Sequence, residues 1–200
     1  MFVQVFQAKV SDPEGLRKQM DRWDDEIRPG AIGHLGSTAG VTEGGNFIAI
    51  GRFESAEAAD QNAARPEQSQ WFEETSSYFD GEPTFHNCTD VQTWLDGGSD
   101  DAGFVQIIQA RVKDVDRLMV LIESSEADIR RDRTAIIGGL VAHHGDGGFT
   151  ESIYFTSESE AREQERLHPA EGDEFVRELQ SLVEGPHTFM DLKEPRLFGP

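Results

Sequence analysis

The chain has 200 residues and a formal net charge of −20 at pH 7, because 38 acidic residues outnumber 18 basic ones. Such a surface repels phosphate groups, so we expect neither nucleic acid nor an anionic membrane as a partner. No apolar run approaches the roughly 20 residues that a membrane-spanning helix needs. The single cysteine, Cys88, permits no intrachain disulfide, and together these features predict a globular cytoplasmic protein.

The first strand-like segment of the chain returns half-way along it. Residues 2–10 (FVQVFQAKV) match residues 104–112 (FVQIIQARV) at six of nine positions, an offset of 102 residues. The same offset pairs Leu16 with Leu118, and a one-residue slip pairs Phe72 with Phe175. This repetition predicts two similar modules of about 100 residues each.

The first half of the first module reads as a strand, a helix and a hairpin. Residues 2–10 are rich in β-branched and aromatic side chains, which is typical of a strand. Asp12 and Pro13 supply an N-cap and a first-turn proline for a helix that ends at residues 28–30. Residues 31–42 predict a glycine-bent strand, residues 43–46 a turn and residues 47–53 a buried strand.

The second half of the module reads as a broken helix and a last strand. Ser55 caps the helix, and Pro66 starts its continuation after a break near Arg65. We place Trp71, Phe72 and Phe79 on that continuation, and the last strand at residues 83–91. The resulting order βαββαβ is that of a ferredoxin-like module, and the second half of the chain repeats it.

These elements predict an α+β fold of two tandem ferredoxin-like modules. We expect module 1 at residues 1–93, a polar linker at 94–103 and module 2 at 104–200. Apolar residues occur on both faces of the expected strands, so both sheet faces need cover. We therefore expect the two antiparallel sheets to pack on each other as a pseudo-dimeric α/β barrel within one chain. Such a chain needs no partner to bury its sheets, so we expect a monomer and leave a further homodimer open.

The sequence resembles the dimeric α/β-barrel superfamily, and within it the antibiotic biosynthesis monooxygenase-like branch. The residues that carry the resemblance are the opening strand, the stretch FESAEAA at 53–59, and Pro66 followed by Trp71 and Phe72. The resemblance covers both halves of the chain. It implies this fold and a family that includes cofactor-independent quinol monooxygenases, haem-degrading proteins, chlorite-dismutase-like haem proteins and muconolactone-isomerase-like enzymes.

Two histidines of module 1 are the candidate catalytic groups. His34 lies on the second expected strand and His86 on the last one, and each could move a proton in a pocket. Trp71, Phe72 and Asn87 are the candidate substrate-binding residues. The alternative is that both histidines are packed residues without a chemical role. Module 2 offers a glycine pair and Met190 near the two histidine positions, so we expect the pocket in module 1.

Other chemistry-bearing residues give weaker signals. Cys88 has no second cysteine and no basic neighbours, so it is not expected to act as a nucleophile. His143 and His144 point to opposite faces of a strand, so an exposed hairpin is favoured over a metal site. His168 precedes Pro169 at the helix break of module 2. We expect no metal.

Three functions remain open from the sequence. The first is a cofactor-independent oxygenase or isomerase that acts on a small aromatic or polyketide-like molecule. The second is a non-catalytic protein that binds a small molecule or is associated with stress. The third is a haem-binding protein, which would need an axial histidine and a wide apolar cavity. We expect no cofactor and keep haem as the less favoured alternative.

Overall fold

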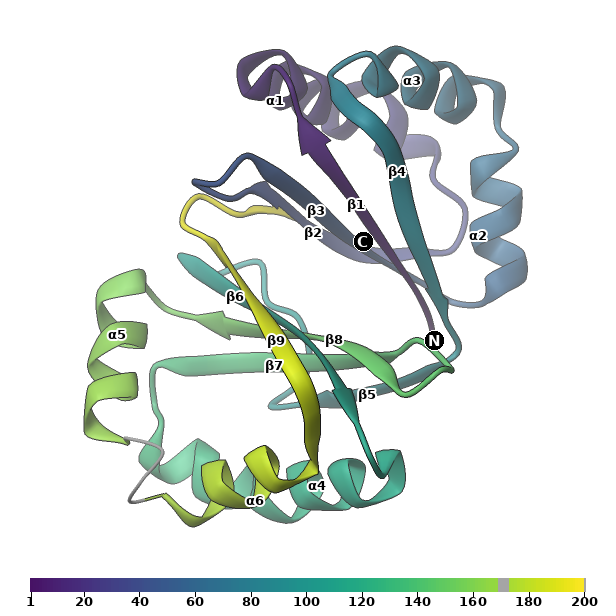
Figure 1. Cartoon of the computed structure of the whole chain (residues 1–200). Helices are drawn as coiled ribbons and strands as arrows, with labels where there is room; N and C mark the ends of the chain where they lie inside the picture. Colours follow the sequence, from purple (N-terminus) through teal and green to yellow (C-terminus); the bar gives the residue numbers. More distant parts are fainter. Residues whose placement is uncertain (169–172, 200) are drawn as a thin grey trace. The chain divides into compact units, whose positions relative to one another are not determined.

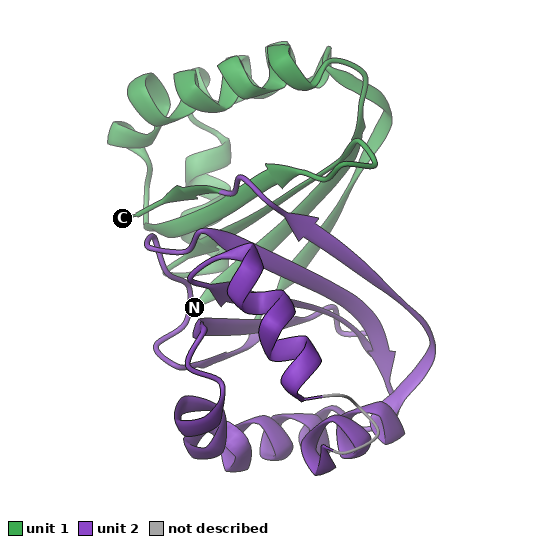
Figure 2. Ribbon diagram, turned by 90° about the vertical axis from the view of Figure 1, so that its left-hand side faces the viewer, with its two compact units in different colours: residues 1–89, 196–200 green, residues 90–195 purple. Residues whose placement is uncertain are grey.

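The computed structural model describes residues 1–168 and 173–199. It divides the chain into two compact units, shown in green and purple in Figure 2. Unit 1 contains Met1–Thr89 together with the C-terminal segment that begins at Arg196, and unit 2 contains Asp90–Pro195. Each unit holds one antiparallel sheet of five strands. The fold is α+β, with two tandem ferredoxin-like modules, as the repeat predicts.

Unit 1 follows the expected βαββαβ order. Its helices lie on one side of its sheet (Figure 1). Its main elements are β1 (Phe2–Val10), α1 (Pro13–Arg22), β2 (His34–Val41), β3 (Asn46–Phe53), α2 (Ala56–Ala63), α3 (Pro66–Ser76) and β4 (Phe79–Cys88).

The local chemistry at the helix ends explains where the unit 1 helices begin. The Asp12 carboxylate accepts a hydrogen bond from the Gly15 N–H at 3.0 Å, and Pro13 stands in the first turn of α1. The Ser55 hydroxyl caps α2 by accepting from the Ala58 N–H at 3.1 Å. After Arg22 the chain continues as a π-helix, Trp23–Ile27, and a 3₁₀ turn, Arg28–Gly30. The single regular helix expected here is therefore wrong beyond Arg22.

One residue of the expected second helix belongs to a strand. Phe79 begins β4, and α3 ends at Ser76. The aromatic side chain of Phe79 fits the helical spacing from Trp71 and Phe72, which explains the error. Its backbone instead pairs with Val10 of β1.

Unit 2 repeats the order of unit 1, and its helices also cover one side of its sheet (Figure 1). Its main elements are β6 (Phe104–Val112), α4 (Val115–Asp132), β7 (Ile136–His143), β8 (Gly148–Phe155), α5 (Glu158–Leu167), α6 (Glu174–Leu182) and β9 (Val183–Leu192).

The central strands of the two units have the same register. Phe2 pairs with Phe53 in unit 1, and Phe104 pairs with Phe155 in unit 2. Both second strands also carry an irregularity after their first residue, His34 or Ile136. The offset of 102 residues read from the sequence is therefore also the structural offset of these strands. Ile136, rather than a glycine, takes the register position of His34.

Each sheet is completed by a strand from beyond its own repeat. The strand β5 (Asp90–Trp94) follows β4 in the chain but pairs with β7 of unit 2. The strand β10 (Arg196–Phe198) follows β9 but pairs with β2 of unit 1. The expected linker 94–103 overlaps this arrangement, because Trp94 and Leu95 are buried in the core of unit 2. The chain thus changes units at Asp90 and again at Arg196.

The strands bury residues on both of their faces. In β1, the Phe2 side chain packs against Ala59 of α2. Val3 and Val5 point to the opposite face of the sheet, and both are fully buried. The pairing of the two sheets remains a prediction. None of the described helices is both long enough and apolar enough to cross a membrane.

Candidate functional site

Unit 1 contains a cavity of about 430 Å³ on the helix-facing side of its sheet. We call it the unit 1 cavity. This volume lies in the range of small-molecule pockets. Its lining residues come from all three helices and from every strand of the sheet: Gln4, Phe6, Met20, Trp23, His34, Ser37, Ala39, Phe47, Ala49, Gly51, Phe53, Ala59, Asn62, Ala63, Gln68, Ser69, Trp71, Phe72, Thr75, Phe85 and Phe198.

The floor of the cavity is open because its central residues are small. Ala39 of β2 pairs with Ala49 of β3, and Gly51 lies one pleat further along β3 on the same face. No side chain longer than a methyl group rises from these three positions. The floor therefore leaves room for a flat molecule above the middle strands.

Aromatic rings form the walls around this floor. The rings of Phe6 and Phe72 make an edge contact with centroids 5.8 Å apart, and Phe6 also lies 4.9 Å from Phe85. The indoles of Trp23 and Trp71 lie 6.4 Å apart. Aromatic surfaces of this kind bind flat apolar rings well.

His34 is the titratable side chain among the described lining residues. Its Nε2 lies 3.0 Å from the Ser37 hydroxyl oxygen, with the donor set by the ring tautomer. Its ring makes edge contacts with Trp23 at 5.4 Å and with Phe53 at 5.8 Å. Gly33, just before it, has a φ of 60°, a value that favours glycine. The backbone bend at the start of β2 thus places the His34 imidazole in the cavity wall, where Ser37, Trp23 and Phe53 hold it.

Neutral polar groups complete the lining. The Gln4 side-chain N–H donates to the Asn87 Oδ1 at 2.9 Å, and the Trp23 indole N–H donates to the Gln68 Oε1 at 2.9 Å. Asn62 has a structural role, because its Oδ1 accepts from the Ile32 backbone N–H at 3.1 Å. None of the described lining residues is Asp, Glu, Lys or Arg. The site therefore suits an uncharged ligand with a few polar atoms.

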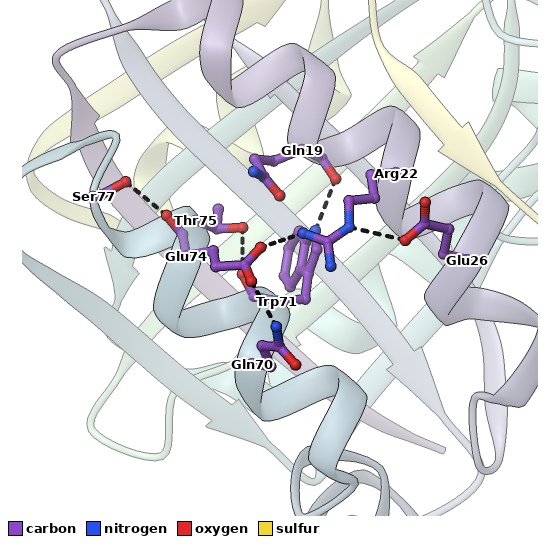
Figure 3. Close-up of polar contacts among 8 residues, drawn as sticks. All are labelled: Gln19, Arg22, Glu26, Gln70, Trp71, Glu74, Thr75 and Ser77. Atoms are coloured by element: carbon purple, nitrogen blue, oxygen red, sulfur yellow. Dashed lines mark hydrogen bonds and ion pairs between the residues drawn. The ribbon is translucent and has the colours of Figure 1, made fainter.

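A polar network holds α3 against α1 above the cavity (Figure 3). The Trp71 indole N–H donates to the Gln19 carbonyl at 2.8 Å, and Arg22 forms an ion pair with Glu74. A hydrogen bond from Gln70, with the Arg22 guanidinium, lowers the pKa of the Glu74 carboxyl. Because Trp71 is anchored at its nitrogen, its ring has a fixed position in the cavity wall.

The structure brings together three of the five candidate residues from the sequence. His34, Trp71 and Phe72 line the unit 1 cavity. His86 pairs with Val5 and points to the opposite face of the sheet from Phe6 and Phe85, so it does not line the cavity. Asn87 also lies outside the lining, although it holds Gln4, which is part of it. The functional roles of all five residues stay predictions.

Cys88 lies beyond Asn87 at the end of β4. It is buried, and burial raises the pKa of its thiol to about 11. The thiol is therefore protonated near neutral pH, which makes it a poor nucleophile.

The histidines of unit 2 do not form a comparable site. His143 is buried at the end of β7, so the exposed hairpin expected there is wrong for this residue. His144 Nε2 lies 2.9 Å from the Thr150 hydroxyl oxygen. His168 lies 3.6 Å from the Asp173 carboxylate, and Pro169 falls outside the described residues. No group of three or more His, Cys, Asp or Glu side chains suited to a metal ion occurs in the described part of the chain.

Several lining residues were missed from the sequence. Gln4, Ser37 and Phe85 were not singled out, and Phe198 reaches the cavity only because β10 joins the sheet of unit 1. One signal was present in the repeat itself. The offset of 102 residues aligns Ala39, Ala49 and Gly51 with Val141, Glu151 and Ile153, so the first copy has the smaller residue at each of these three positions.

Comparison with known proteins supports the fold assignment. No protein-family model matches the chain, and no curated protein matches it in sequence. Solved structures do match it over nearly its whole length. A candidate monooxygenase from Fusobacterium nucleatum has a TM-score of 0.77 at 9% identity, covering 99% of this chain and 94% of its own.

Two further structures show the same likeness. A candidate monooxygenase from Lactobacillus acidophilus has a TM-score of 0.69 at 13% identity, covering 98% of both chains. An anthrone oxidase-like protein has a TM-score of 0.64 at 10% identity, covering 98% of this chain and 92% of its own. The resemblance expected from the sequence is thus confirmed at the level of the fold, and this fold is monooxygenase-like.

Proposed function

We propose that unit 1 binds a small, uncharged aromatic or polyketide-like molecule and acts on it as a cofactor-independent oxygenase. The observation that carries the proposal is the unit 1 cavity. It combines aromatic walls, a floor of small residues and one imidazole, with no charged side chain among its described lining residues. Fold alone does not choose this function, since one fold hosts many activities.

The substrate is a flat ring system that carries hydroxyl or carbonyl groups. Its face lies over Ala49 and Gly51, and its edges contact the rings of Phe6, Phe72 and Trp71. Polar atoms at its ends reach His34 and Ser37 on β2, or Gln4 on β1. β3 lies between β2 and β1, so these two groups are separated by about 10 Å, twice the usual spacing of neighbouring strands.

His34 is the general base in this proposal. Its imidazole removes a proton from a phenol, or from a ring CH₂ group activated by a neighbouring carbonyl. The resulting electron-rich carbon reacts with O₂. The CH₂ group loses two hydrogens and gains one oxygen to become a carbonyl, and the second oxygen leaves with those hydrogens as water. Carbon gives up four electrons and O₂ takes up four, so no outside reductant is needed.

An isomerase would use the same base differently. It would return the proton to another atom of the substrate and consume no oxygen. Oxygen uptake therefore separates the two reactions, and ligand binding without turnover would indicate a binding protein. A Soret band in the purified protein would instead support haem binding.

The test compares His34→Gln with His86→Gln. Anthrone and a simple hydroquinone serve as probes, and oxygen uptake is measured alongside the fluorescence of Trp23 and Trp71. We expect His34→Gln to lower turnover by about 10²–10⁴-fold, the usual contribution of a general base, while binding is largely kept. His86→Gln should leave both unchanged, because His86 does not line the cavity.

Two outcomes would contradict the proposal. Equal turnover in both variants and the unaltered chain would remove the proton-transfer role of His34. Failure of all aromatic probes to change the fluorescence of Trp23 and Trp71 would mean that the cavity is not an aromatic binding site.

A further inference from the structure

Glu151 of unit 2 is a buried carboxyl group in an apolar setting. It is 7% exposed, and it lies on β8 between Val141 of β7 and Ile108 of β6. Among the described residues it has no hydrogen bond or ion pair. Its counterpart in unit 1 is Ala49, in the floor of the unit 1 cavity. Burying a lone carboxylate is costly, so the site favours the protonated form.

His143 is a second buried polar group on the same face of the sheet. It is 4% exposed, and neither ring nitrogen has a hydrogen-bond partner in the described part of the chain. It pairs directly with Phe149, two residues before Glu151, so His143 and Glu151 are diagonal neighbours across β7 and β8. The two buried polar side chains therefore lie in one region of the helix-facing side of the sheet. The counterpart of His143 in unit 1 is Val41.

We propose that the buried, unpaired Glu151 is held in its protonated form beside the neutral imidazole of His143, and that loss of the Glu151 proton weakens the packing of α4 and α6 on the sheet of unit 2. The helices contribute apolar residues such as Leu118, Ile122 and Leu182 to the core that covers this face. An ionised Glu151 beneath them either draws in water or moves outward. Either response opens the layer between sheet and helices.

Other charged groups on the elements packed against this face have partners of their own. Burial is the cause of the raised pKa of Glu151, about 7, and burial also lowers the pKa of His143, opposed by the charge of Asp90. On α4 and α6 the ion pairs include Arg117–Glu178, Arg130–Glu126 and Arg131–Asp128, and Arg133–Asp173 lies beside α6. On α5 and β9 Arg162 pairs with Glu165 and Asp191, and the His187 ring contacts the Phe189 ring.

The two titrations act on stability with opposite signs. Glu151 binds its proton more tightly in the folded chain, so its contribution is full below the ordinary pKa of 4.5 and is lost as the pH rises to about 7. His143 binds its proton less tightly when folded, so it destabilises the chain as the pH falls below 6.5. Replacing Glu151 by a neutral isostere should leave only the second effect.

Hydrogen exchange of the full chain tests the proposal. The exposed residue Glu184 supplies the control Glu184→Gln, and residues 34–53 of unit 1 supply an internal reference. The measured quantity is the opening constant of residues 136–155 in the unaltered chain divided by the same constant in Glu151→Gln. We expect this ratio to rise by more than about tenfold between pH 5 and 8. The same ratio should stay constant for residues 34–53, and Glu184→Gln should behave like the unaltered chain.

A parallel pH dependence in the unaltered chain and Glu151→Gln would overturn the proposal. Should Glu151→Gln fail to fold, carbon NMR of the glutamate carboxyls in the unaltered chain decides the matter. One glutamate carboxyl that titrates near neutral pH would support a protonated Glu151. Ordinary titration of every glutamate near pH 4–5 would overturn it.

Discussion

The two units build the same strands in the same register, yet the three positions that carry small residues at the centre of the unit 1 sheet carry larger residues in unit 2. Unit 1 has Ala39 and Gly51 at positions where unit 2 has Val141 and Ile153. The edge strands that come from the other repeat, β10 in unit 1 and β5 in unit 2, also place the larger side chain in unit 2. Phe198 pairs with Ser37 in unit 1, and Trp94 pairs with Gly139 in unit 2. A Cβ atom at Gly139 would collide with the Trp94 indole, so this ring lies directly on the sheet.

Side-chain volume at these positions decides whether this backbone leaves a cavity on the helix-facing side of the sheet. Unit 2 fills the space with branched residues and an indole, and its core cluster includes Trp94 with Val141 and Phe149. Unit 2 also contains a polar group that unit 1 lacks, in which Arg162 binds both Glu165 and Asp191. Duplication allows this division, because one copy can supply stability while the other keeps a cavity.

Trp94→Ala should have the largest effect on stability. Removing a buried aromatic ring from a filled core costs about 3–5 kcal/mol in the free energy of unfolding. Phe198→Ala, the matched change in unit 1, should cost roughly half as much, because one side of Phe198 already borders the cavity. Urea denaturation followed by circular dichroism measures both. Equal costs would mean that the two edges of the sheets are packed alike.

Giving unit 1 the floor of unit 2 should abolish ligand binding. In the double variant Ala39→Val with Gly51→Ile, we expect affinity for an aromatic probe to fall at least about 100-fold, or about 2.7 kcal/mol. The added methyl and sec-butyl groups occupy the space above β2 and β3. Calorimetric titration measures the loss. The reciprocal variant Val141→Ala with Ile153→Gly in unit 2 should leave the affinity unchanged, and a loss there would place the ligand in unit 2.

Trp71→Phe should have a smaller effect than either of these changes. The ring remains aromatic, but its hydrogen bond to the Gln19 carbonyl is lost, which costs about 1 kcal/mol of stability. Glu74→Gln, at the exposed end of the same network, should change the urea midpoint less. If Trp71→Phe leaves both the midpoint and the affinity for an aromatic probe unchanged, the anchored indole has no role in shaping the cavity.

Much of the fold could be predicted because the information was local or repeated. The hairpin of β2 and β3 follows from the short turn at residues 43–46 and the alternating apolar residues, and the repeat then supplies the same hairpin in unit 2. The swapped strands could not be predicted in this way. Nothing within Asp90–Trp94 or Arg196–Phe198 says which sheet edge they join, since edge pairing depends on distant backbone groups.

The candidate site was predictable only in part, because it too depends on residues that are distant in the sequence. His34, Trp71 and Phe72 stand out as single residues with chemical or aromatic character, and all three line the cavity. The cavity itself depends on what is absent at Ala39, Ala49 and Gly51, and small residues attract little notice in one sequence. The strand assignment did place His86 and Asn87 on opposite faces, but it gave no indication of which face was hollow.

The exchange of edge strands makes the two halves inseparable as building blocks. A fragment ending near residue 94 would carry β5 without β7 to receive it, and its own β2 would lose β10. The uncovered edge of β2 would then offer unpaired N–H and C=O groups to any other extended chain. Proteolysis or gene truncation near the midpoint would therefore yield sticky, aggregation-prone pieces rather than two working domains. A viable circular permutant would have to keep both crossings of the chain intact.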